Sequence, residues 1–262
     1  MRLPLNLRRL TSRLVRRVPV RIRGGPNRGL RWSLAAAGRG FWSGSFERDR
    51  TRALAELIRP GERFWDGGAH QGYVTLLASR RVGVDGIVAS LEPSGYNRWY
   101  LERHVDWNDL DNVRVFPVAL AREDGRRSFD ETGSSVTFHV GEGSGSVPVR
   151  SPPSLAAEVG SPTFVKLDIE GGETEVMEQV LELLPDHGAA FVALHSPEAD
   201  RRAREIFAGA GFTLLPSARL RAYRRRDRGW PGDPDVVALG PDRPVDLEGL
   251  GKLPFFASPA SR

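Results

Sequence analysis

The sequence predicts an α/β fold in which helices cover the faces of a β-sheet. Short apolar runs of strand-like composition alternate with helix-like segments between residues 61 and 240. Several of these runs end in an acidic residue or a glycine turn, as strands do at the crevice of an open α/β sheet. The chain has 262 residues, 40% hydrophobic and 27% charged, which is typical of one soluble globular domain.

A small N-terminal cap is predicted at 24–60, before the core. Residues 22–34 are expected to form a hairpin, because strand-like residues flank a turn made of Gly24, Gly25, Pro26 and Asn27. The pattern at 47–58 predicts a helix, which Pro60 and Gly61 stop.

The core at 61–240 follows with regular alternation. Strands are predicted at 63–66, 87–91, 113–118, 163–168, 190–194, 212–215 and 235–239, and helices at 72–80, 95–106, 173–184 and 198–209. Residues 125–160 interrupt this alternation with glycines and prolines, and predict a hairpin and a loop laid over a site. Residues 241–262 are expected to be a tail of the single domain at 24–262.

The leader at 1–23 is strongly basic. Glu47 is the first acidic residue, after Arg2, Arg8, Arg9, Arg13, Arg16, Arg17, Arg21, Arg23, Arg28 and Arg31. Leucines at 3, 7, 10 and 14 and Val18 recur as in an amphipathic helix, which indicates either a membrane or partner contact or a leader packed loosely on the domain. No apolar run is long enough for a transmembrane helix, and arginines interrupt any signal-peptide centre, so we expect a cytoplasmic protein.

Cysteine is absent from the chain, which excludes disulfides, cysteine-bound zinc and thiolate catalysis. The most informative stretch is 64–75, where an apolar strand ends in Asp66 and a turn containing Gly67, Gly68 and Gly72 leads into a helix. The glycines let backbone amides approach a ligand. A carboxylate at this place repels a pyrophosphate and attracts an ammonium group, so Asp66 favours S-adenosylmethionine over a dinucleotide.

A second acid, Glu92, follows the strand at 87–91 and lies 20 residues after Gly72. There it can accept hydrogen bonds from both ribose hydroxyls of a nucleoside, which either cofactor contains. The dinucleotide fingerprint G-x-G-x-x-G, started at Gly67, needs glycine where this chain has Ala69. An NAD-dependent oxidoreductase is therefore the weaker alternative.

A third constellation ends the strand at 163–168. Asp168 and Glu170 follow this strand and are expected to lie near the two acids above, because strand ends meet at one crevice. Lys166 stands in an apolar strand, so it must be paired or reach the site, with Asp168 as one partner. Glu173 and Glu175 are interpreted as first-turn acids of the next helix.

In order and spacing, these motifs resemble the FkbM family of S-adenosylmethionine-dependent methyltransferases over roughly 24–240. The matching segments are 44–47, 66–73, 92–93 with Asn97, 118–120 and 166–173. The resemblance implies a class I methyltransferase fold with a mainly parallel seven-stranded sheet, and methyl transfer to a hydroxyl of a sugar, glycan or natural product. The chain departs from the family at Ala193-Leu194-His195, where members of the family often have Glu-x-His.

The resemblance also implies roles for single residues. It places the cofactor among Glu47, Asp66, Gly67, Gly68, Ala69, Gly72, Glu92, Ala119 and Leu120. Glu92 is assigned to the ribose. Asp66, Gly67 and Gly68 are assigned to the methionine part, and Ala119 and Leu120 to the adenine.

Catalysis by methyl transfer needs little beyond alignment, but an aliphatic hydroxyl is a poor nucleophile that a base would assist. His195 and Asp168 are the candidate bases. Asp168 and Glu170 alternatively hold a divalent cation such as magnesium. Ser135 and Lys166 are expected to contact the substrate.

The remaining motifs are interpreted as structural. His104, His139 and His187 are expected at the surface or in loops. Ser151-Pro152-Pro153-Ser154 precedes an expected strand and lacks an aromatic residue to stack a base, so nucleic acid is disfavoured. The arginines between 219 and 228 form either a solvated loop or a site for an acidic acceptor. A non-catalytic cofactor-binding or membrane-surface module is the third functional alternative.

Overall fold

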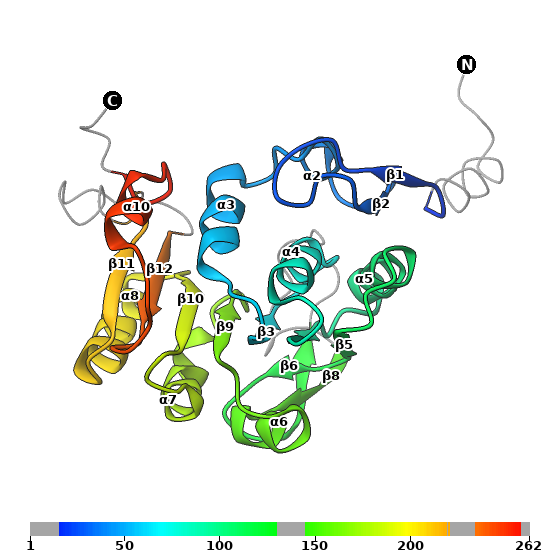
Figure 1. The fold of residues 1–262 in the computed structure, drawn as a ribbon. Coiled ribbons are helices and arrows are strands. Elements are labelled where there is room, and N and C mark those ends of the chain that lie inside the picture. Colours follow the sequence, from blue (N-terminus) through cyan, green and yellow to red (C-terminus); the bar gives the residue numbers. More distant parts are fainter. Residues whose placement is uncertain (1–15, 130–144, 219, 221–233, 258–262) are drawn as a thin grey trace.

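A seven-stranded, mainly parallel sheet with helices on both faces forms the centre of the molecule in this computed structural model (Figure 1). The structure describes residues 16–129, 145–218, 220 and 234–257. The spatial order is β11 (Thr213–Pro216), β12 (Asp235–Leu239), β10 (Ala189–Ala193), β9 (Phe164–Leu167), β3 (Arg63–Gly67), β4 (Ile87–Leu91) and β5 (Val113–Phe116). Strand β12 runs antiparallel to both of its neighbours, and the other pairings in this sheet are parallel.

Alternate residues of each strand fill two cores, because successive side chains of a strand point to opposite faces. Phe64 packs with helices α3 (Arg48–Leu57), α4 (Tyr73–Val82) and α10 (Leu247–Lys252). Trp65 belongs to the core that contains α6 (Pro152–Val159), α7 (Glu173–Leu183) and α8 (Pro197–Ala203), which continues as a π-helix over Arg204–Ala208. The segment expected to be a tail therefore contributes to the first core, where Phe255 and Phe256 are also buried.

The cap begins with a two-stranded hairpin of β1 (Pro19–Arg21) and β2 (Arg31–Ser33), followed by α2 (Arg39–Ser43) and α3. Strand β1 lies before residue 24, so the hairpin includes the end of the expected leader. Strand β2 packs against α5 (Gly95–Trp107) (Figure 1). Within the described residues, no helix is long and apolar enough to cross a membrane.

His104 of α5 fastens this hairpin, which corrects the expectation that it lies at the surface or in a loop. Its Nε2 accepts a hydrogen bond from Ser33 N at 2.9 Å, and its Nδ1 lies 2.7 Å from Gln71 O, so Nδ1 carries the proton. The ring stacks on Trp32 at 3.8 Å and has no exposed surface. Burial lowers the pKa of His104 to about 4, although the bond to Gln71 opposes this effect.

The interrupting segment contains the predicted hairpin and also a helix that the sequence interpretation missed. Strands β7 (Gly125–Phe129) and β8 (Gly145–Arg150) pair antiparallel, and β8 also pairs with β6 (Ala119–Leu120). The Ser151-Pro152-Pro153-Ser154 motif begins α6 instead of preceding a strand. Ser151 caps this helix by accepting a hydrogen bond from Ser154 N, and Pro152 starts its first turn.

Candidate active site

A cavity of about 590 Å³ lies where the glycine loop, the ends of β9 and β10 and the start of β12 meet the cap. Its lining includes seven of the predicted site residues, namely Glu47, Gly68, Ala69, Lys166, Asp168, Glu170 and His195. The cap adds Phe41 and Phe46, and the C-terminal part of the chain adds Asp235 and Phe255. Segments that are distant in sequence therefore form one site.

Six other predicted site residues are not among the lining residues. They are Asp66, Gly67, Gly72, Glu92, Ala119 and Leu120. Ser135 lies outside the described residues. The described parts of 125–160 do not line the cavity either, so the expected cover over the site is not formed by β7, β8 or α6.

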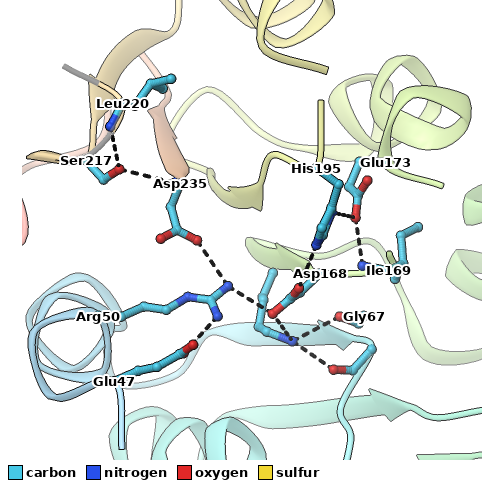
Figure 2. Close-up of polar contacts among 12 residues, drawn as sticks. Glu47, Arg50, Gly67, Asp168, Ile169, Glu173, His195, Ser217, Leu220 and Asp235 are labelled. Atoms are coloured by element: carbon cyan, nitrogen blue, oxygen red, sulfur yellow. Dashed lines mark hydrogen bonds and ion pairs between the residues drawn. The ribbon is translucent and has the colours of Figure 1, made fainter. Parts of the chain in front are cut away.

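Arg50 of α3 joins three carboxylates in this cavity (Figure 2). Its guanidinium lies 2.9 Å from Glu47, 2.9 Å from Asp168 and 3.1 Å from Asp235. Burial alone would lower the pKa of Arg50, but the charges of these acids outweigh it and raise the pKa well above its ordinary value. Arg50 therefore stays charged and fixes the positions of acids from the cap, β9 and β12.

Asp168 is ionised and held from two sides. Burial acts to raise its pKa, but Arg50, Lys166 and His195 lower it to about 2. Oδ2 accepts the hydrogen bond from Arg50, whereas Oδ1 lies 3.7 Å from His195 Nε2. This carboxylate can accept a hydrogen bond at neutral pH, but it is a weak base.

His195, at the end of β10, is oriented by a buried acid. Its Nδ1 lies 3.0 Å from Oε1 of Glu173, and its Nε2 lies 3.7 Å from Asp168 (Figure 2). The same Nε2 lies 3.7 Å from Glu170. Burial would lower the pKa of His195, but the hydrogen bond and charge of Glu173, with the two other acids, raise it to about 9. His195 is therefore an imidazolium at neutral pH.

Glu173 has a more specific role than that of a first-turn acid, as which it was interpreted. It has no exposed surface, and its carboxylate accepts hydrogen bonds from Ile169 N and Gly171 N. The loop between β9 and α7 is thereby fixed in the shape that presents Glu170, whose φ of +54° is rare for a residue other than glycine. Glu175 does lie at the surface, where it pairs with Arg127.

Lys166 lines the cavity, but its ammonium group is paired inside the protein, and its predicted contact with a substrate stays a prediction. Its Nζ donates to Asp66 Oδ1, Gly67 O and Gly68 O at 3.0, 3.1 and 2.9 Å. An ammonium group has three donors, so all of them are used inside the protein. Lys166 holds the glycine loop against β9, and its main partner is Asp66 instead of Asp168, which lies 3.8 Å away.

Asp66, which is expected to touch the cofactor, is likewise engaged inside the protein. It has no exposed surface, and its second oxygen accepts a hydrogen bond from Thr75 Oγ1 at 2.7 Å. Because both of its oxygens are engaged inside the protein, Asp66 supports the loop from behind. Asp168 and Glu47 are among the acids that line the cavity.

Glu92 supports the same loop from β4. It is 4% exposed and accepts hydrogen bonds from His70 N at 2.7 Å and Ser94 N at 2.9 Å. Burial raises the pKa of Glu92 to about 7, although these bonds oppose the effect. The predicted contact with a ribose would have to compete with these backbone donors.

Gly68 shows why this loop needs glycine. Its φ is +70°, and a Cβ added there would lie 1.9 Å from the carbonyl oxygen of Asp168. The loop can therefore approach the end of β9 only without a side chain. Two other residues that line the cavity, His70 and Glu47, also have positive φ angles. For residues other than glycine such angles indicate backbone strain.

One set of side chains has a composition that suits a metal ion. Asp168, Glu170 and His195 each offer a ligand atom, and these atoms lie within 4.8 Å of one another. The predicted pair Asp168 and Glu170 is thus brought together, and His195 joins it. In the described structure the same atoms are balanced by Arg50 and by the proton on His195.

Comparison with known proteins agrees with the fold. No family model and no curated protein matches the sequence. Among solved structures, the chain is similar to precorrin-6y C5,15-methyltransferase from Geobacter metallireducens, with 13% identity, a TM-score of 0.51 and coverage of 78% of this chain and 93% of that one. Most of the structural neighbours are methyltransferases by name, and the chain has the class I methyltransferase Rossmann-like fold.

Two further neighbours are less similar. Fibrillarin from Aeropyrum pernix, solved with bound S-adenosyl-L-methionine, has 14% identity, a TM-score of 0.48 and coverage of 73% and 75% of the two chains. Methyltransferase FkbM from Methylobacillus flagellatus has 15% identity, a TM-score of 0.46 and coverage of 78% and 56%. Similarity at this level does not establish membership of the FkbM family.

Proposed function

We propose that the protein is an S-adenosylmethionine-dependent O-methyltransferase that acts in the cytoplasm on a hydroxyl of a sugar, glycan or natural product. The observation that carries this proposal is the cavity at the strand ends of a class I methyltransferase fold, where a glycine loop faces Asp168 and Glu47. Ligands of open α/β sheets bind at this crevice, beyond the carboxyl ends of the strands.

The cavity offers carboxylates to the positive charges of the cofactor. S-adenosylmethionine carries an ammonium and a sulfonium group, and the lining includes the carboxylates of Glu47, Asp168, Glu170 and Asp235, three of which also pair with Arg50. Gly68 and Ala69 provide a wall of backbone and small side chains beside these acids. When bound, the cofactor supplies the methyl group, and the protein's task is to align donor and acceptor.

The acceptor hydroxyl is proposed to lie at Asp168 and His195. Asp168 Oδ1 accepts the hydroxyl hydrogen bond and so orients the oxygen, because this carboxylate is ionised. His195 takes the proton only in the fraction of molecules in which its Nε2 is free of its own proton. Arg50 and Glu173 position these two side chains without touching the acceptor.

Calorimetry with S-adenosylmethionine and with NAD tests the cofactor. We expect binding of the former and none of the latter, and absence of S-adenosylmethionine binding would overturn the proposal. His195→Gln should bind the cofactor as the wild type does and lose turnover. The acceptor itself is found by mass spectrometry of methylated products that are missing from a deletion strain.

A divalent cation is a second proposal for the same site, carried by the Asp168, Glu170 and His195 ligand set. A bound Mg²⁺ would lower the pKa of the acceptor hydroxyl. Activity should then be lost with a chelator and return with Mg²⁺, and Glu170→Gln should weaken Mg²⁺ activation. Full activity of a chelated sample would exclude this role.

A further inference from the structure

Exposed apolar side chains gather at one place on the cap. Of the five large hydrophobic side chains exposed in the described part of the chain, three are Val18, Leu34 and Tyr96, at 43%, 43% and 41%. Leu34 N donates a hydrogen bond to Val18 O, and the guanidinium of Arg16 lies 5.2 Å from the ring centre of Tyr96. These residues, with exposed Arg17, are called the cap face below.

The cap face lies within a basic part of the molecule. Residues 16–46 contain seven arginines and no acidic residue. Those outside the cap face are Arg21, Arg23, Arg28, Arg31 and Arg39, and all five are exposed. Several arginines with no acidic residue between them create a positive potential that attracts an anionic surface.

The leader sequence continues this combination. The apolar residues Leu3, Leu7, Leu10 and Leu14 recur with helical spacing up to Val18, which belongs to the cap face. Arg2, Arg8, Arg9 and Arg13 alternate with them, so the chain places further apolar and arginine residues directly before the face. Apolar side chains beside arginines are typical of segments that lie at a bilayer surface.

We propose that the cap face docks the protein on an anionic lipid bilayer. The apolar side chains would enter the headgroup region, while the surrounding arginines contact lipid phosphates. This docking does not depend on the methyl transfer proposed above.

Single-stranded nucleic acid fits the same face less well. Stacking of bases needs free aromatic faces. Here guanidinium groups cover the rings, with Arg16 over Tyr96, Arg23 over Trp42 at 5.2 Å and Arg103 over Trp99 at 4.2 Å. The aliphatic pair Val18 and Leu34 also has no partner on a nucleic acid backbone, whereas lipid chains accept it.

Vesicle co-sedimentation of the full chain tests the proposal. Vesicles of phosphatidylcholine alone are compared with vesicles that contain phosphatidylglycerol. One variant removes apolar surface, Val18→Ser with Leu34→Ser, and a second removes charge, Arg17→Gln with Arg28→Gln and Arg39→Gln. The matched control is Arg114→Gln with Arg122→Gln and Arg204→Gln, which removes three exposed arginines away from the cap.

We expect binding to the anionic vesicles only, with partition coefficients at least about tenfold lower for each cap variant and unchanged for the control. Circular dichroism and thermal unfolding confirm that the variants are folded. Equal binding of the control and charge variants, binding to neutral vesicles, or no vesicle binding by the wild type would overturn the proposal. Tighter binding to a single-stranded RNA oligonucleotide than to the anionic vesicles would also overturn it.

Discussion

At the residue scale, His195 shows how a buried network sets the charge of a functional group. Three acids surround its ring and raise its pKa to about 9, above the ordinary value of about 6.5. The protonated form therefore stabilises the fold. This contribution is complete below pH 6.5 and is lost as the pH rises through 9.

Activity should accordingly rise with pH toward 9 if the neutral imidazole is the base. Glu173→Gln should lower the pKa of His195 toward its ordinary value and move the activity profile to lower pH, because the first partner of Nδ1 loses its charge. Titration of the histidine NMR signals measures this pKa. Glu175→Gln is the control, since Glu175 pairs with Arg127 at the surface. A wild-type pKa near 6.5 would contradict the prediction.

Gly68 permits a comparison between steric clash and backbone strain. Gly68→Ala should cost about 1–3 kcal/mol more free energy of unfolding than Gly61→Ala. Both residues have positive φ, at +70° and +77°, but only at Gly68 would the new Cβ meet another atom, the Asp168 oxygen. Urea unfolding gives both values, and similar losses in the two variants would show that the clash is relieved by movement of the loop.

At the element scale, the β1–β2 hairpin is fastened to α5 by a histidine that must stay neutral. The pKa of His104 is about 4, below its value in the unfolded chain, so its contribution to stability is present above pH 6.5 and is lost as the pH falls toward 4. Over that interval the loss amounts to about 3 kcal/mol.

Urea unfolding at pH 7.5 and pH 4.5 measures this loss. His104→Gln should be less stable than the wild type at pH 7.5 and should lose less stability on acidification. His187→Gln, at an exposed position, should leave the acid dependence unchanged. An unchanged dependence in His104→Gln would mean that other groups cause it.

Local patterns predicted most elements but not how the ends of the chain are used. Every predicted core strand has a counterpart, because each is a short apolar run between turn residues. Helix α6 is not predicted because Pro152 and Pro153 are typical of turns, although proline also suits a first helical turn. The buried position of His104 depends on β2, 71 residues away, which no local pattern encodes.

At the scale of the whole molecule, Arg50 connects the cap, the middle of the sheet and its antiparallel strand. Arg50→Gln should lower the free energy of unfolding by about 3 kcal/mol, because buried Asp235 and half-buried Asp168 lose their common cation, as does the exposed Glu47. Arg50→Lys should retain only part of the stability that Arg50 provides, since an ammonium cannot replace the planar guanidinium. Arg52→Gln, an exposed change on the same helix, should stay within about 0.5 kcal/mol of the wild type. A loss for Arg50→Gln no greater than that of Arg52→Gln would contradict this role.

The sequence predicted only part of the candidate site. Asp168, Glu170 and His195 follow strands, and strand ends meet at one edge of a sheet, so their meeting was foreseeable. The sequence interpretation missed Arg50 and Asp235. A signal for Arg50 existed, since Glu47 precedes it by one helical turn, but nothing in the sequence assigned it to acids of other elements. Asp66 and Glu92 are predicted to contact the cofactor, whereas their engagement by Lys166 and by His70 N is a tertiary feature that no local pattern shows.

The distance in sequence between Arg50 and its partners also orders events during synthesis. Asp168 lies 118 residues further along the chain, so at roughly 5–20 residues per second it leaves the ribosome roughly 6–24 seconds after Arg50. Asp235 follows later still. Through that interval α3 carries a cation without two of its acids, although α4 and α5, on which the cap hairpin packs, are already made. The hairpin can thus be packed early, whereas the charge of Arg50 is balanced by all three acids only after Asp235 has been made.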